Sequence, residues 1–169
     1  VIKTLLGEQG CVVVSLPHIA HSAALACMAD EDFQYRDWGL LDRTHIRFFG
    51  IRNIQALVEQ AGFKILDAAF VVKAPEETEF ADQWVRSPAA LREALAANPF
   101  GMVYQVVFKA VPDTAPGDAI KLTSVPVPRA ATYRGYRIKH ALKGWVRSHT
   151  SFETRAKIRR IAARFGVNL

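Results

Sequence analysis

Residues 39–50 have the sequence GLLDRTHIRFFG and lie between the pattern of a strand and helix on one side and the pattern of a second helix on the other. Several polar side chains stand here among apolar neighbours: Asp42, Arg43, Thr44, His45 and Arg47. So many polar groups are unusual in a buried strand, and the two phenylalanines that follow them are unusual in a loop exposed to solvent. The segment therefore predicts a loop held down at the mouth of a pocket.

The residues before this loop predict a strand and a helix. Residues 11–16 form a nearly continuous apolar run rich in Val, which is typical of a central strand covered on both faces. Pro17 ends this strand, and residues 19–29 fit a helix. The polar and aromatic stretch 30–38 then predicts the start of the loop.

The residues after the loop continue the alternation of helix and strand. Apolar residues recur at helical spacing over 51–61, and Gly62 stands where a helix C-cap glycine is expected. Strand and helix patterns then follow in turn at 63–72, 88–97 and 102–110. This order predicts an α/β fold, the second half of a doubly wound, Rossmann-like sheet.

Proline usage and charge divide the chain into three parts. Residues 1–111 form the predicted α/β domain, and residues 112–131 form a linker that holds four of the eight prolines. Residues 132–169 form a basic tail with two amphipathic helices. The 11 Lys and Arg residues of 129–169 stand against one Glu, a net charge of +10, whereas residues 1–128 carry 11 basic and 15 acidic residues, a net charge of −4.

Three partners suit the basic tail: an anionic membrane surface, the phosphates of a nucleic acid, or another protein domain. Trp145 and Phe165 favour domain docking or the membrane surface. Nothing in the sheet region suits base readout, so nucleic acid is the least favoured partner. A charged, solvated helix face is the plain alternative.

Composition argues against a secreted or membrane-spanning chain. Cys11 and Cys27 lack C-x-x-C spacing and are typical of buried thiols in a cytosolic protein. The uncharged stretch 9–29 is long enough to span a bilayer, but it contains Ser, His and Pro residues that are costly in lipid. Residues 1–10 lack a signal-peptide pattern, and the chain lacks an initiator Met. We therefore expect a cytoplasmic location and a start inside a longer polypeptide.

Three separated motifs carry a resemblance to a known family: VVVSLPHIAH at 12–21, GLLDRTHIRFF at 39–49 and ALVEQAGF at 56–63. In this order and spacing they resemble the C-terminal half of a class I S-adenosylmethionine-dependent methyltransferase, from a bacterial branch often encoded with surface-glycan genes. The resemblance covers residues 1–111. The family's glycine-rich cofactor loop has no counterpart here and is expected upstream of Val1.

The resemblance implies both a fold and an activity. The last two strands would form an antiparallel, hairpin-like edge with one strand inserted between neighbours. The activity would be O-methylation of a sugar, a glycan or another small hydroxyl acceptor, with S-adenosylmethionine as cofactor. This chain would supply acceptor-side residues, and it would be inactive and bind the cofactor weakly without the missing N-terminal half or a neighbouring domain.

The loop carries the predicted catalytic residues. Methyl transfer to a hydroxyl needs a base near the acceptor oxygen, and His45 is the leading candidate because histidine titrates near neutral pH. Asp42 is suited to orient it; the alternative is that His45 bonds backbone and fastens the loop. Arg43 and Arg47 suit a phosphate or carboxylate of the substrate, with a salt bridge to Asp42 or Asp37 as the alternative.

His18 and His21 follow the first strand, at the end where ligands bind in open α/β sheets. We therefore predict that both contact the substrate, although family members commonly have Asn at the position of His18. Their spacing would suit a metal on a helix, but without a third ligand nearby we predict no metal. The alternative is that the pair caps the helix or faces solvent.

A second function class stays open beside the enzyme. An exposed sheet edge invites pairing with another chain, and the basic tail would then serve as an anchor. Under this hypothesis the protein is a non-catalytic assembly or anchoring module.

Overall fold

The computed structural model describes residues 2–7 and 10–129 of the chain. These residues belong to one compact unit, Val1–Ala130. The predicted helices of the basic tail, 132–169, lie outside the described residues. Within the described ranges, no helix is long and apolar enough to cross a membrane.

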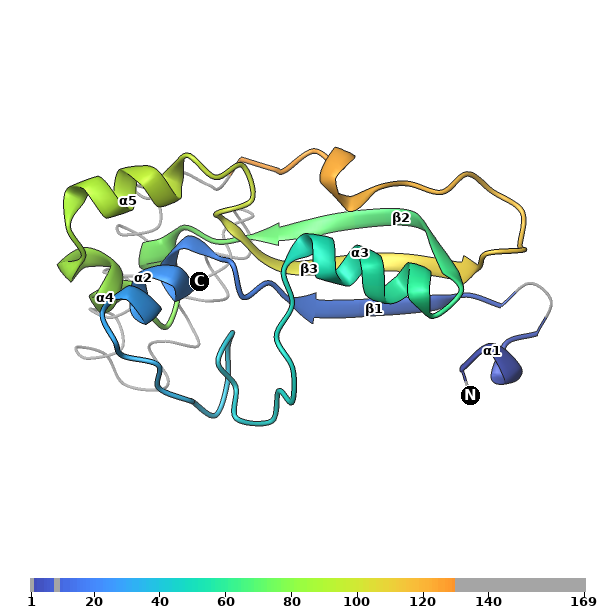
Figure 1. Ribbon diagram of the computed structural model, residues 1–169, viewed down its shortest axis with the longest axis horizontal. Helices are drawn as coiled ribbons and strands as arrows, with labels where there is room; N and C mark the ends of the chain where they lie inside the picture. The colour runs from blue at the N-terminus through green and yellow to red at the C-terminus, as the bar shows by residue number, and fades with distance from the viewer. Residues whose placement is uncertain (1, 8–9, 130–169) are drawn as a thin grey trace, which may run out of the picture. The chain divides into compact units, whose positions relative to one another are not determined.

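The chain has a mixed α/β fold built on a three-stranded sheet (Figure 1). The strands are β1 (Val12–Pro17), β2 (Phe63–Val72) and β3 (Val103–Pro112), in the order β1-β3-β2. β3 is antiparallel to both neighbours. The α/β class is thus confirmed, but the pairings differ from the parallel ones of a doubly wound sheet.

β1 is not the central strand that its apolar sequence predicts. β3 takes the middle place, because it pairs with β1 through Val14 and Phe108 and with β2 through Ala68 and the same Phe108. In the described sheet β1 therefore lies at an edge. Its side chains alternate, and Val13 is 72% exposed. The expectation of cover on both faces was wrong, since only one face of β1 packs against the core.

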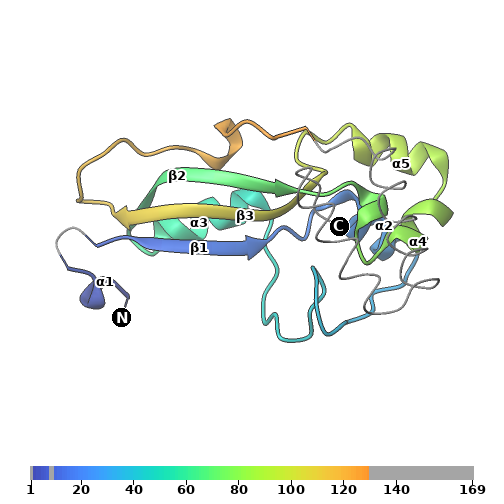
Figure 2. The ribbon, with the colours of Figure 1, turned by 180° about the vertical axis from the view of Figure 1, so that it is seen from behind.

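Helix α3 (Ile51–Gln60) covers the other, buried face of the sheet, as Figures 1 and 2 show from two sides. Its apolar stripe packs with the sheet residues in one core, which includes Ile51, Ile54, Val58, Ile65, Phe70, Val106 and Phe108. Gly62 follows the helix with a positive φ of 72°, a conformation that costs glycine little. The predictions of this helix and its C-cap glycine are confirmed.

α2 (Ser22–Ala29), α4 (Ala81–Arg86) and α5 (Ala89–Ala96) lie beyond the end of the sheet at which β1 and β2 finish (Figure 1). α2 begins three residues later than predicted, because His21 caps it. After β2 come the short turn η1 (Pro75–Glu77) and the helices α4 and α5. The other described elements are α1 (Ile2–Leu5) and η2 (Leu122–Ser124).

The described part of the predicted linker packs on the domain. Leu122 is fully buried, and its amide donates a hydrogen bond of 2.9 Å to the side-chain oxygen of Gln55. The amide of Ile120 donates to the carbonyl of Ile65 at 2.9 Å. Apolar residues between the prolines thus hold this segment against α3 and β2.

The two cysteines were predicted to be buried. Cys27 is buried, but Cys11 is exposed.

Candidate functional site

The candidate site lies at the end of the sheet where β1 and β2 both finish. Their arrowheads point toward α2 and α4 in Figure 1. The loop of residues 30–50 reaches this end: the amide of Ile19 donates to the carbonyl of Phe49 at 3.1 Å, and His18 forms a bridge with Phe49. The last turn of the loop is therefore fixed to the residues that follow β1.

His21 is fully buried and uses both ring nitrogens. Nε2 donates to the carbonyl of Lys73 at 3.0 Å, and Nδ1 accepts from the amide of Ala23 at 3.1 Å. This pattern requires a neutral ring, since a protonated Nδ1 cannot accept a hydrogen bond. Burial lowers the pKa of His21 to about 4, against an opposing contribution from the Lys73 carbonyl. The alternative of a helix cap is thus confirmed for His21.

His18 is also buried, with an exposed fraction of 2%. Its Nδ1 lies 3.0 Å from the carbonyl oxygen of Val103 and donates to it. Burial lowers the pKa of His18, so the ring stays neutral near pH 7. Both histidines hold backbone together at the end of the sheet, and this arrangement favours a structural role over the predicted substrate contact.

Glu79 connects the loop to the sheet, and sequence reasoning missed it. One carboxylate oxygen accepts from the amide of Leu40 at 2.5 Å, and the other accepts from the hydroxyl of Tyr104 at 3.0 Å. The ammonium of Lys73 lies 3.7 Å from the centre of the Tyr104 ring. Burial and the negative charge of Glu79 raise the pKa of Tyr104, so its hydroxyl remains a donor. The acidic stretch after β2 could have drawn attention to Glu79, but sequence does not show its partner Leu40, which lies 39 residues earlier.

Gly39 makes room for this carboxylate. Its φ is +96°, and a Cβ at this position would stand 2.1 Å from an oxygen of Glu79. A larger residue would meet both backbone strain and a collision. The glycine at the start of the GLLDRTHIRFFG segment is thus required by the contact that holds the loop.

His45 is half-buried within the loop. Its Nδ1 lies 3.3 Å from the carbonyl oxygen of Leu40, and its ring meets Phe48 edge-on at 6.3 Å. The carboxylate of Asp42 instead accepts from the amide and the hydroxyl of Thr44, at 2.8 and 2.7 Å. These hydrogen bonds lower the pKa of Asp42. The contact that orients the His45 ring therefore comes from Leu40, and the predicted role of Asp42 in orienting it has no support in this geometry.

The two predicted arginines lie on the surface of the loop. Arg43 forms a salt bridge of 3.0 Å with Asp37, and both side chains are largely exposed. Arg47 is exposed as well. An exposed pair of this kind contributes little to stability, so the guanidinium of Arg43 can exchange Asp37 for a substrate anion at small cost. The salt-bridge alternative holds for Arg43 in this structure.

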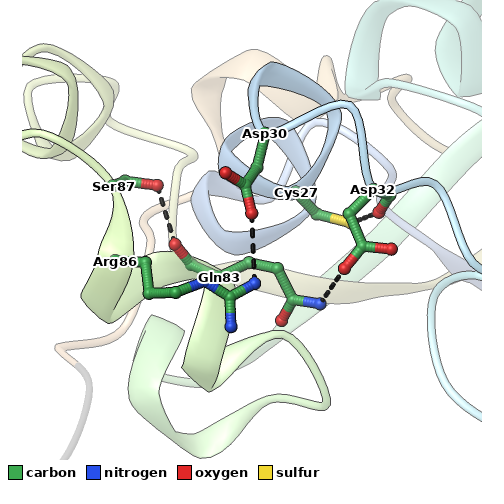
Figure 3. A network of polar contacts seen from close by, with 6 residues as sticks. All are labelled: Cys27, Asp30, Asp32, Gln83, Arg86 and Ser87. Atoms are coloured by element: carbon green, nitrogen blue, oxygen red, sulfur yellow. Dashed lines mark hydrogen bonds and ion pairs between the residues drawn. The ribbon is translucent and has the colours of Figure 1, made fainter.

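A second group of polar contacts fixes the start of the loop to α4 (Figure 3). The thiol of Cys27 donates to the carbonyl of Asp32, whose carboxylate accepts from the side-chain amide of Gln83 at 2.7 Å. Arg86 pairs with Asp30 at 3.1 Å. The loop is thus held at its start, at Leu40 and at its end, as predicted, whereas the pocket expected beside it stays a prediction.

Two further observations bound the chemistry of this region. In the described part of the chain, no three His, Cys, Asp or Glu side chains gather to hold a metal ion. An open hollow of about 380 Å³ lies along α3, lined by Arg52, Gln55, Ala56, Glu59 and Thr123. None of the predicted site residues lines this hollow.

Comparison with known proteins does not assign the chain to a family. No protein-family model matches the chain, and no curated protein matches it either.

Proposed function

We propose that this chain is the acceptor-side half of an S-adenosylmethionine-dependent methyltransferase that acts on a hydroxyl group. The observation that carries the proposal is the loop of residues 39–50, which carries His45 and is fixed at Leu40 by Glu79 and at Phe49 by the bridge to His18, directly after the end of β1. Ligands bind at this end of the strands in open α/β sheets. The reaction is inferred from the sequence resemblance, and we place it at the loop.

The strand order supports the same proposal. β1 and β2 are both antiparallel to β3, so they run parallel to each other, and the connection between them contains α2, the loop and α3. The last strand then lies between them. The resemblance implies a late strand inserted between neighbours at the edge of the sheet. Antiparallel pairings alone do not identify a methyltransferase sheet, but this order is compatible with the edge of one.

His45 is suited to accept the proton of the acceptor hydroxyl. If Nδ1–H donates to the Leu40 carbonyl, Nε2 keeps its lone pair and serves as the base. S-adenosylmethionine would supply the electrophilic methyl group. The protein's part is then to hold the acceptor in line and to take up its proton. Cofactor contacts would come mostly from residues upstream of Val1, so the present chain would bind the cofactor weakly.

Calorimetry tests this proposal directly. S-adenosylhomocysteine is titrated into the 169-residue chain and into a version extended upstream through the predicted cofactor half. Binding by the extended chain alone supports the proposal. Binding by the short chain means that the cofactor site is built differently, and no binding by either chain refutes the methyltransferase.

An assembly or anchoring module is the second candidate. It is favoured by β1, which pairs only with β3 among the described residues, and by the exposed side chain of Val13 beside that edge. An exposed strand edge can pair with another chain. The basic tail, residues 132–169, would be the anchor to an anionic membrane surface, and a cytoplasmic location fits both proposals. A concentration-dependent mass in sedimentation, without cofactor binding by the extended chain, would favour this candidate.

A further inference from the structure

The backbone of Leu40 takes part in two contacts of the loop. Its amide donates to the carboxylate of Glu79 at 2.5 Å, and its carbonyl oxygen lies 3.3 Å from Nδ1 of His45. The side chain of Leu40 is fully buried, and so is that of Leu41, whose carbonyl accepts from the amide of Arg36 at 2.8 Å. The backbone at Leu40 is therefore fixed, and the contact at its amide helps to set where its carbonyl points.

The carboxylate of Glu79 is itself anchored in the middle strand of the sheet. Its second oxygen accepts from the hydroxyl of Tyr104, in β3, at 3.0 Å. The Tyr104 ring is buried, with the ammonium of Lys73 at 3.7 Å from its centre and the ring of His21 edge-on at 5.9 Å. Hydrogen bonds to a carboxylate are stronger than those between neutral groups. Glu79 thus joins β3 to the backbone that contacts His45.

We propose that Glu79 is a positioning residue for His45 and acts on its ring through the backbone of Leu40. A fixed carbonyl beside Nδ1 favours the neutral tautomer with its proton on Nδ1, because only that form donates to the carbonyl. A neutral histidine side chain free in water favours the other tautomer, with the proton on Nε2. The catalytic use of the Nε2 lone pair rests on the proposed function, whereas the tautomer is a property of this chain alone.

His18 and His21 provide an internal reference for each tautomer. Nδ1 of His18 and Nε2 of His21 each donate to a backbone carbonyl at 3.0 Å. Neither of these hydrogen bonds involves Glu79, so both tautomers should persist when the Glu79 carboxylate is removed. A change confined to His45 would therefore separate positioning from a general loosening of the fold.

The test is ¹⁵N NMR of the histidine rings in the 169-residue chain at about pH 8, where an ordinary histidine is neutral. The shifts of the two ring nitrogens identify the tautomer, and a His45→Gln variant assigns the signals. In the unchanged chain His45 should be mainly in the Nδ1–H form. Glu79→Ala should lower the ratio of Nδ1–H to Nε2–H about fivefold, in line with the net strength of one hydrogen bond. Glu79→Gln, which keeps an acceptor oxygen, should retain most of the ratio.

Two further variants give the other end of the contact and the control. Tyr104→Phe removes the hydroxyl that anchors Glu79 and keeps the ring, so it should lower the ratio in the same direction. Glu77→Ala is the matched control, because Glu77 lies in the same acidic stretch and also accepts from a backbone amide, that of Ala74 at 3.1 Å. It should leave the tautomer of His45 unchanged.

An excess of the Nε2–H form of His45 in the unchanged chain would overturn the inference, as would a ratio that Glu79→Ala leaves unchanged. Equal losses in the Glu79→Ala and Glu77→Ala variants would do the same, because they would show a general loosening. If Glu79→Ala does not fold, the ratio in Tyr104→Phe decides.

The chain extended upstream separates this inference from the proposed function. The Nδ1–H form without cofactor binding by the extended chain would support the positioning by Glu79 and refute methyl transfer. Where methyl transfer is measured, Glu79→Ala should lower kcat about 10-fold to 100-fold and leave KM nearly unchanged, because a misplaced base slows the chemical step. An unchanged kcat in an active extended chain would overturn the positioning role and leave methyl transfer standing.

Discussion

Gly39→Ala tests whether the loop depends on the carboxylate of Glu79. The substitution places a methyl group where it would stand 2.1 Å from an oxygen of Glu79, on a backbone with φ of +96°. Both effects act on the folded state alone. We therefore expect the variant to fold with a displaced loop and with lower stability.

The structure sets the size of this loss. An alanine held in the left-handed region costs about 1 to 2 kcal/mol. Glu79 must also move, and this weakens its hydrogen bonds to the Leu40 amide and the Tyr104 hydroxyl. A hydrogen bond to a charged group contributes about 1.5 to 3 kcal/mol. Losing one of them along with the backbone strain lowers the free energy of unfolding by about 3 kcal/mol.

Urea unfolding followed by circular dichroism measures that free energy, and the amide signal of Leu40 reports the contact itself. Gly7→Ala is the control, since an added Cβ at Gly7 meets nothing within 4 Å and its φ is not positive. The control should unfold as the unchanged chain does. Neutral surface substitutions change the free energy of unfolding by up to about 0.5 kcal/mol. A change no larger than this in Gly39→Ala would refute the proposed role of Glu79.

Three further predictions concern His21, Leu122 and His45. The folded pKa of His21 is lowered to about 4 from 6.5, so its contribution to stability is present above pH 6.5 and is lost as the pH falls toward 4. The loss amounts to about 3 kcal/mol, and His21→Asn, which keeps an acceptor for the helix cap, should flatten this dependence in urea titrations at a series of pH values. Leu122→Ala should lower the free energy of unfolding by about 2 to 4 kcal/mol. The control Leu5→Ala, at an exposed position, should change it little. Equal effects of the two substitutions would mean that the segment around Leu122 is a linker that does not stabilise the domain. In the chain extended upstream, His45→Ala should reduce methyl transfer about 100-fold or more while Asp42→Asn retains most of it, and retained activity in the His45 variant would refute the base.

Local patterns predicted the elements that depend on local physics. The β-branched and aromatic run of β2 predicts Phe63–Val72 with the bounds that the structure has. The apolar stripe of α3 and the glycine after it predict that helix to within a residue of its end. In both cases one side of the element meets the core, and the period of the pattern reports that side.

The contacts that build the site join residues far apart in the chain, and no local pattern reports them. Glu79 meets Leu40 and Tyr104 across 39 and 25 positions. His18 reaches Val103 across 85 positions. Sequence alone marked His45 in the loop and the two histidines after β1, because polar residues are unusual among such apolar neighbours. It could not show that Leu40, and not Asp42, holds the ring of His45.

β1 carries more apolar surface than the described sheet buries. A continuous apolar run is typical of a strand covered on both faces, yet Val13 is 72% exposed and Val71, on the same face across the sheet, is 41% exposed. Burying apolar surface of this kind would stabilise the protein by about 25 cal/mol per Å². The mismatch is a physical argument that another layer can cover this face of the sheet. A second half of the domain would supply it under the enzyme proposal, and a partner chain would supply it under the assembly proposal. In either case Val13→Lys should leave the isolated chain folded and should prevent that association.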